Sequence, residues 1–288
     1  MLYISEPRYV PRVWGSLAVP GLEDPVGEIW WLCHEEFTSS LLRKAEGGEP
    51  TSVDDLVASD KLPGESVYPV LLKTLHTADK LSVQVHPGIG DSTLRKEETW
   101  LVLAAESGAW MMGGLKDNDR ELFLDLLRTG RVEEVLRRID LTAGDIYHIP
   151  PGTVHSLGPG LQILEVQSNC NVTYRLYDWG RTGIDGRPRE LHIEKSMEAV
   201  DWSRGGSPVP IGMDGKIDRL KLKAGYRISD FEGKSNMDIP GGALFFVSSG
   251  SVAIQGHTVN SPACIIADMD GGQLQLSGAG YLIEPGGN

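Results

Sequence analysis

Two strand-like stretches carry the side chains that decide the fold: LSVQVHP at residues 81–87 and GDIYHIPPGTVH at residues 144–155. In the first stretch Ser82, Gln84 and His86 alternate with apolar residues, which predicts a strand with one polar and one apolar face. In the second, a Pro-Pro-Gly turn predicts that His155 stands at the start of a strand. Glu98 opens the β-rich run ETWLVL at residues 98–103, and its carboxylate can face the same interior if the two strands are neighbours. These patterns predict a mainly β fold with polar groups gathered on one interior face.

The polar groups of these stretches form a plausible ligand set for a metal ion. Gln84, His86, Glu98 and His155 offer one amide oxygen, two imidazole nitrogens and one carboxylate. Mixed nitrogen and oxygen donors suit Zn²⁺, and Fe²⁺, Mn²⁺, Co²⁺ and Ni²⁺ are alternatives. Because a single carboxylate leaves a divalent ion with net positive charge, the ion could polarise a carbonyl or hydroxyl oxygen. We therefore predict one catalytic metal site per chain, with Zn²⁺ as the expected ion.

The two stretches resemble the two halves of the cupin metal motif. Further motifs, in the same order along the chain, make it similar to the type I phosphomannose isomerases (mannose-6-phosphate isomerases) of the short bacterial kind. These motifs are PRVWG at 11–15, LLK at 71–73 and TYRLYDWGR at 173–181. The resemblance covers the first two thirds of the chain. It implies cupin (jelly-roll) barrels and the metal ligands Gln84, His86, Glu98 and His155.

The resemblance also implies an activity, the interconversion of mannose 6-phosphate and fructose 6-phosphate through an enediol intermediate. It places Ser82, Lys73 and Lys96 at substrate-contact positions, so that Ser82 with Lys73 or Lys96 would hold the phosphate of the hexose 6-phosphate. Arg175 matches the active-site arginine and would offset negative charge on the intermediate. Glu165 is the expected proton shuttle, and Lys96 is the alternative shuttle.

Two other functions stay open on the sequence. The family commonly has Asp four residues before its arginine, whereas this chain has Asn171, and GIGD at 88–91 replaces the usual acidic pair. These departures favour a sugar-phosphate-binding cupin without turnover as one alternative. Two histidines and one carboxylate also satisfy the facial triad of Fe(II) dioxygenases. Gln84 and the lysine and arginine set argue against a dioxygenase, which needs no phosphate anchors.

Composition narrows the possible partners and location. A net charge of -13 over 288 residues argues against nucleic acid, which is bound through clustered cations. It does not exclude an anionic substrate, because charges beyond a Debye length of about 8 Å are screened. The N-terminus lacks a signal-peptide pattern, and no apolar run approaches the roughly 20 residues needed to span a bilayer. Three widely spaced cysteines argue against a disulfide framework. We expect a cytoplasmic protein without membrane association, as a monomer or homodimer.

A change to a glycine-rich, β-like sequence after about residue 200 predicts two domains. Residues 1–200 are expected to form the metal-binding catalytic cupin, with helical inserts at about 36–60 and 118–139. Within these inserts the helical candidates are 36–44 and 118–139, the second broken at Gly130. Residues 201–288 are expected to form a degenerate cupin half without a metal site, with a hairpin over 243–254 and His257 at the surface or in a hairpin.

Overall fold

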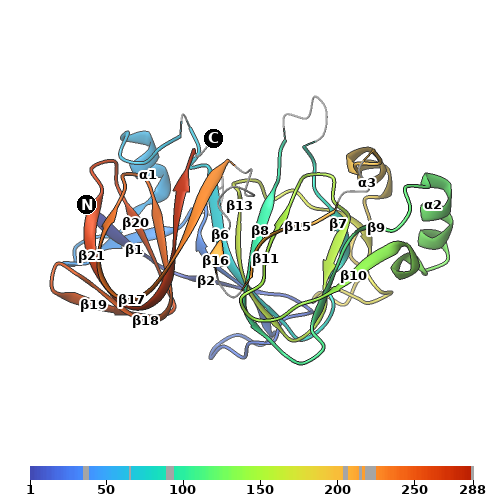
Figure 1. Cartoon of the computed structure of the whole chain (residues 1–288), viewed down its shortest axis with the longest axis horizontal. Helices are drawn as coiled ribbons and strands as arrows, with labels where there is room; N and C mark the ends of the chain where they lie inside the picture. Colours follow the sequence, from blue (N-terminus) through green and yellow to red (C-terminus); the bar gives the residue numbers. More distant parts are fainter. Residues whose placement is uncertain are drawn as a thin grey trace. The chain divides into compact units, whose positions relative to one another are not determined.

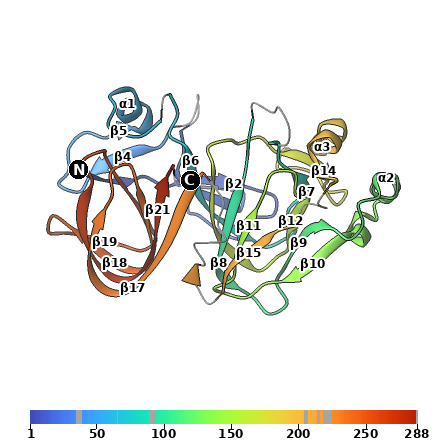
Figure 2. The same cartoon turned by 45° about the horizontal axis from the view of Figure 1, so that its top comes forward.

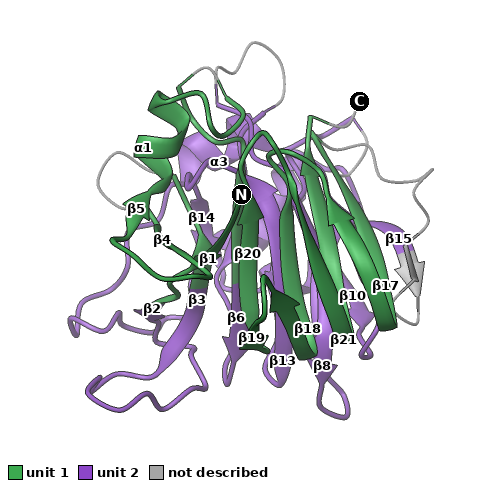
Figure 3. Ribbon diagram, turned by 90° about the vertical axis from the view of Figure 1, so that its left-hand side faces the viewer, with its two compact units in different colours: residues 1–8, 30–73, 215–288 green, residues 9–29, 74–214 purple. Residues whose placement is uncertain are grey.

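Antiparallel strands dominate the computed structural model, which describes residues 1–34, 39–64, 66–88, 94–203, 207–213, 216–217 and 225–286 (Figure 1). The mainly β prediction is confirmed. The chain divides into two compact units (Figure 3). Unit 1 comprises residues 1–8, 30–73 and 215–288, and unit 2 comprises residues 9–29 and 74–214.

Unit 1 is built on one sheet with the strand order β17–β21–β18–β20–β1–β4–β5, and β19 pairs with β18. Its strands are β1 (Leu2–Ser5), β4 (Leu41–Lys44), β5 (Thr51–Ser52), β17 (Tyr226–Ile239), β18 (Leu244–Ile254), β19 (His257–Asn260), β20 (Ala263–Ala267) and β21 (Gly272–Pro285). Alternate residues of the long strands, such as Phe245, Leu274 and Leu276, form its buried core. The helix α1 (Val53–Ala58) begins at Ser52, whose side chain forms a capping box with Asp55.

The N-terminal segments of unit 1 explain why its range differs from the predicted division near residue 200. Strand β1 pairs with β20 on one side and with β4 on the other. Residues 41–44 were expected to be helical and are a strand, so that prediction is wrong; residues 35–38 lie outside the described residues. Leu42 is fully buried while its neighbours Leu41 and Arg43 are exposed, which is the period-2 pattern of a strand.

Unit 2 contains a five-stranded sheet, β10–β9–β12–β7–β14, and most of a second sheet, which runs β16–β15–β11–β8–β13–β6–β3–β2. Figure 2 shows β9, β12 and β7 side by side. The strands of the five-stranded sheet are β7 (Val83–Val85), β9 (Trp110–Leu115), β10 (Leu136–Asp140), β12 (His155–Leu157) and β14 (Tyr174–Tyr177). Those of the second are β2 (Arg8–Pro11), β3 (Val26–Leu32), β6 (Val70–Thr77), β8 (Glu98–Ala105), β11 (Ile146–Ile149), β13 (Leu161–Ser168) and β15 (Val209–Met213); β16 (Lys216–Ile217) follows β15 in the chain. The two sheets pack face to face, because one core cluster draws Trp100, Val102 and Ile163 from one sheet and Met111 and Leu157 from the other.

Short helices cover the face of the five-stranded sheet that carries Val85, because Phe123 and Met197 belong to the same core cluster as that residue. The helix α2 (Arg120–Arg128) begins at Asp119, which accepts hydrogen bonds from two backbone amides of the first turn, and it buries Phe123 and Leu127. Gly130, with φ +70°, breaks the helical segment as predicted, and a 3-10 helix (Val132–Val135) follows. The helix α3 (Ile193–Ala199) follows β14.

Two predicted boundaries are wrong. Residues 136–139 belong to strand β10 rather than to the helix predicted over 118–139, because they pair antiparallel with β9. Residues 244–254 form one continuous strand, β18, and the hairpin partner of its second half is β19. His257 is exposed in that hairpin, as predicted. Within the described residues, no helix has the length and apolar character needed to cross a membrane.

Candidate metal centre

Three adjacent strands of the five-stranded sheet place predicted site residues in one row. Gln84 on β7 lies directly opposite His155 on β12 and opposite Arg175 on β14. Val83 and Val85 are fully buried in a core cluster on the other face of β7, so the predicted alternation is confirmed. His155 begins β12, as the Pro-Pro-Gly turn predicted.

Glu98 reaches this row from the opposite sheet. The condition that its strand neighbours residues 81–86 is not met, because β8 pairs with β11 and β13, and the carboxylate reaches the same interior from across the space between the two sheets. Its carboxylate oxygens lie 3.0 Å from His86 Nε2 and 3.8 Å from His155 Nε2. The Gln84 amide nitrogen lies 3.2 Å from His155 Nε2. The ligand atoms of His86, Glu98 and His155 all lie within 4.8 Å of one another, and all three residues are buried.

The tautomers of the two histidines follow from their other contacts. His86 Nδ1 lies 3.1 Å from the carbonyl oxygen of Val172, and His155 Nδ1 lies 2.8 Å from that of Thr153. A carbonyl oxygen only accepts, so each Nδ1 carries the proton and each Nε2 keeps a lone pair. His86 Nε2 and a Glu98 oxygen therefore meet as two acceptors, and neither His86 Nε2 nor Glu98 Oε2 has a hydrogen-bond partner among the described residues. Buried acceptors facing one another are costly unless a cation lies between them, so this cluster fits a divalent metal ion.

The protonation states suit the same role. Burial lowers the pKa of His86 to about 3, with the Lys96 charge acting in the same direction, and burial also lowers the pKa of His155. Burial raises the pKa of Glu98, but the Lys96 ammonium and the two imidazoles lower it more, so that the net pKa lies well below its usual range. At neutral pH the centre therefore holds two neutral imidazoles and one carboxylate, which is the ligand state that a metal requires.

Two further predicted residues border the cluster. Lys96 Nζ donates to Glu98 Oε1 at 2.9 Å, and both side chains are 2% exposed. Ser82 Oγ, also buried, donates to Gln84 Oε1 at 3.4 Å. The site therefore has a metal-ligand set with a cation and a hydroxyl at its edge.

No family model matches this chain. A mannose-6-phosphate isomerase from Streptococcus mutans is 34% identical to it over 215 residues, which cover 69% of this chain and 67% of that relative. The chain belongs to the mannose-6-phosphate isomerase family. Among solved structures, the mannose 6-phosphate isomerase from Bacillus subtilis is similar with a TM-score of 0.78 at 22% identity, over 98% of each chain. A mannose 6-phosphate isomerase bound with zinc and yttrium is similar with a TM-score of 0.71 at 16% identity, over 99% of each chain. The cupin fold of mannose-6-phosphate isomerases thus extends beyond the region of clear sequence similarity.

Two other residues suggested by the family resemblance, Arg175 and Lys73, lie on different strands. Arg175 lies in the row of Gln84 and His155, half-buried, and its Nη1 donates to the carbonyl oxygen of Glu190 at 2.8 Å. Burial lowers the pKa of Arg175, and the neighbouring Arg189 adds to this effect. Lys73 is buried on β6, in the part of that strand that belongs to unit 1.

Glu165 is linked to the ligand cluster through Trp100. Its Oε2 accepts a hydrogen bond from Trp100 Nε1 at 3.0 Å, and the Trp100 ring in turn contacts the His155 ring. Trp100 was not among the site residues predicted from the sequence. Its position two residues after Glu98 was the available signal, because strand periodicity turns both side chains to one face.

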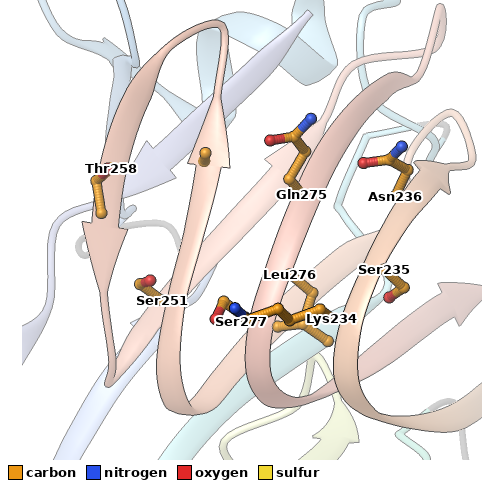
Figure 4. A pocket seen from close by; sticks show the side chains of 9 residues that line it. Lys234, Ser235, Asn236, Ser251, Thr258, Gln275, Leu276 and Ser277 are labelled. Carbon is orange, nitrogen blue, oxygen red and sulfur yellow. The ribbon is translucent and has the colours of Figure 1, made fainter.

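A separate hollow of about 470 Å³ lies over the C-terminal strands of unit 1 (Figure 4). Its lining has one cation and neither histidine nor carboxylate, so it offers no metal-ligand set. The lining residues are Lys234, Ser235, Asn236, Ser251, Ala253, Thr258, Gln275, Leu276 and Ser277.

Proposed function

We propose that this chain is a metal-dependent aldose–ketose isomerase that interconverts mannose 6-phosphate and fructose 6-phosphate. Membership of the mannose-6-phosphate isomerase family supports the reaction. The observation that carries the metal dependence is the buried pair of acceptors, His86 Nε2 and the Glu98 carboxylate, which face each other at 3.0 Å. The zinc-bound relative supports Zn²⁺ as the ion.

Gln84, His86, Glu98 and His155 would hold the ion. The structure supports this set because the ligand atoms of His86, Glu98 and His155 lie within 4.8 Å of one another and the Gln84 amide lies against His155. The amide oxygen of Gln84 is the atom that a metal would take from it, since oxygen is the donor that an amide offers. A bound Zn²⁺ would supply a positive centre able to polarise oxygens of the sugar.

Residues around the metal ligands are proposed to carry out proton transfer, charge stabilisation and substrate binding. The isomerisation moves a proton between C1 and C2, and Lys96 is the candidate group for this transfer because its Nζ stands at the edge of the ligand set. Arg175, in the same row as Gln84, is positioned to offset the negative charge that develops on the sugar oxygens. Ser82 and Lys73 are proposed to contact the substrate and its phosphate, which would orient the reacting carbons.

The test is conversion of mannose 6-phosphate to fructose 6-phosphate by purified protein, as isolated, after chelation and after Zn²⁺ is restored. Activity that is lost on chelation and returns with Zn²⁺ supports the proposal. If hexose 6-phosphate raises the melting temperature without conversion, the chain is a sugar-phosphate binder, and Asn171 becomes the first residue to revert to Asp. Oxygen uptake with added Fe²⁺ would instead indicate a dioxygenase. The cytoplasmic location and the choice between monomer and homodimer stay predictions.

A further inference from the structure

We propose that Glu165 and Trp100 are positioning residues for the metal ligand His155: Glu165 fixes the indole of Trp100, and the indole fixes the imidazole. This proposal rests on the metal centre proposed above and concerns how firmly one of its ligands is held. It gives Glu165 a different role from the proton shuttle suggested by the sequence.

Strand register brings the three residues together. Trp100 lies two residues after Glu98 on β8, so both side chains face the space between the sheets. Glu165 on β13 is the direct partner of Trp100 across the strand pair. Trp100 and Glu165 are 2% and 3% exposed, and the hydrogen bond from Trp100 Nε1 to Glu165 Oε2 measures 3.0 Å. An indole has one N–H donor, so this bond fixes the rotation of the ring.

The same indole that donates to Glu165 also contacts the imidazole ring of His155. The Trp100 and His155 rings contact edge to face, with centroids 5.3 Å apart and an angle of 79° between the planes. The hydrogen bond from His155 Nδ1 to the carbonyl oxygen of Thr153 sets the tautomer, and the His86 ring, with its centroid 4.8 Å away, limits rotation of the imidazole on one side. The indole limits rotation on another side, so that Nε2 stays directed at Glu98 and Gln84. Mutation of groups that orient a metal ligand typically lowers metal affinity by about 10- to 100-fold.

The two roles of Glu165 predict opposite results for one substitution. Glu165→Gln keeps an oxygen that can accept from the indole N–H, so positioning survives. A proton shuttle does not survive it, because an amide cannot exchange a proton in the same way. Glu165→Leu removes the acceptor, and Trp100→Phe removes the donor while an aromatic ring remains.

The experiment measures Zn²⁺ affinity of metal-stripped protein by competition with a chromogenic chelator, together with kcat for mannose 6-phosphate. We expect Glu165→Leu and Trp100→Phe each to weaken Zn²⁺ binding by about 10- to 100-fold. The double variant should bind Zn²⁺ no more weakly than the single variant with the lower affinity. Glu165→Gln should stay within about threefold of wild type in both quantities. Val102→Ala is the control, because Val102 is buried on the same face of β8 and its truncation leaves a cavity without touching the Trp100–Glu165 bond.

The outcomes separate this proposal from the proposed metal centre. If the wild type does not bind Zn²⁺, the centre itself is refuted and the positioning role with it. If the wild type binds Zn²⁺ and the Leu and Phe variants bind it equally well, only the positioning role is refuted. If Glu165→Gln binds Zn²⁺ normally but loses kcat, Glu165 moves a proton and the positioning account is wrong.

Discussion

Replacing Glu98 with glutamine should destabilise the metal-free protein, because it leaves the Lys96 ammonium buried without a counter-charge. The two side chains are 2% exposed and 2.9 Å apart. At that distance, with an effective dielectric constant of about 20, their attraction is about 6 kcal/mol, and the cost of desolvating both ions cancels part of it. Removing one partner of such a buried pair typically costs about 3–5 kcal/mol. The new amide can donate to His86 Nε2, which recovers about 1 kcal/mol, so we expect a net loss of about 2–4 kcal/mol.

The assay is urea-induced unfolding in the presence of chelator, followed by tryptophan fluorescence. The double variant Lys96→Met/Glu98→Gln should recover most of the loss, because it no longer buries an unpaired charge. Glu134→Gln is the matched control. It also breaks an ion pair, with Arg131, but both side chains of that pair are more than half exposed, so the unfolding free energy should hardly change. A loss below about 1 kcal/mol for Glu98→Gln, or a double variant no more stable than the single one, would refute the reasoning.

Three further predictions follow from other contacts. His155→Ala should abolish stoichiometric Zn²⁺ binding measured by elemental analysis, while the exposed His257→Ala should leave the metal content unchanged; equal loss in both would place the site elsewhere. Burial lowers the pKa of His76 to about 4, below its value of about 6.5 in the unfolded chain. The neutral, buried His76 therefore adds at most about 3 kcal/mol to the free energy of unfolding; this contribution is complete above pH 6.5 and is lost as the pH falls towards 4. In urea unfolding at several pH values, His76→Gln should lose less unfolding free energy than the wild type as the pH is lowered. An identical loss in both proteins would contradict this. Gly250→Ala would bring a Cβ within 2.1 Å of a backbone oxygen on β21 and should lower the melting temperature far more than Gly256→Ala, whose Cβ meets no atom of the described residues within 4 Å at a similar positive φ. Equal shifts in melting temperature would show that the backbone moves aside.

The sequence predicted local features of the metal centre well, because they depend on local patterns. Strict alternation over residues 81–86 identified the polar face of β7, and the turn at 150–152 identified the start of β12. Strand periodicity shows which face Glu98 occupies, but not which strand lies beside it. Pairing is a long-range property, so the origin of Glu98 in the opposite sheet could not be predicted. The contact between Trp100 and His155 was missed for the same reason.

The wrong element boundaries have a related cause. Residues 41–44 and 136–139 are short segments in which apolar spacing fits both a helix and a strand. Both segments form strands because of their pairing with other strands: β4 pairs with β1, and β10 pairs with β9. The predicted division near residue 200 differs from the two units because β1, at the start of the chain, pairs with β20 near its end.

The most direct test of the central claim is a Zn²⁺ titration of metal-stripped protein, with bound metal and isomerisation of mannose 6-phosphate measured in the same samples. We expect bound metal and activity to rise together and to level off at one Zn²⁺ per chain. Full activity in metal-stripped protein, or activity that stays absent after one equivalent has bound, would contradict it.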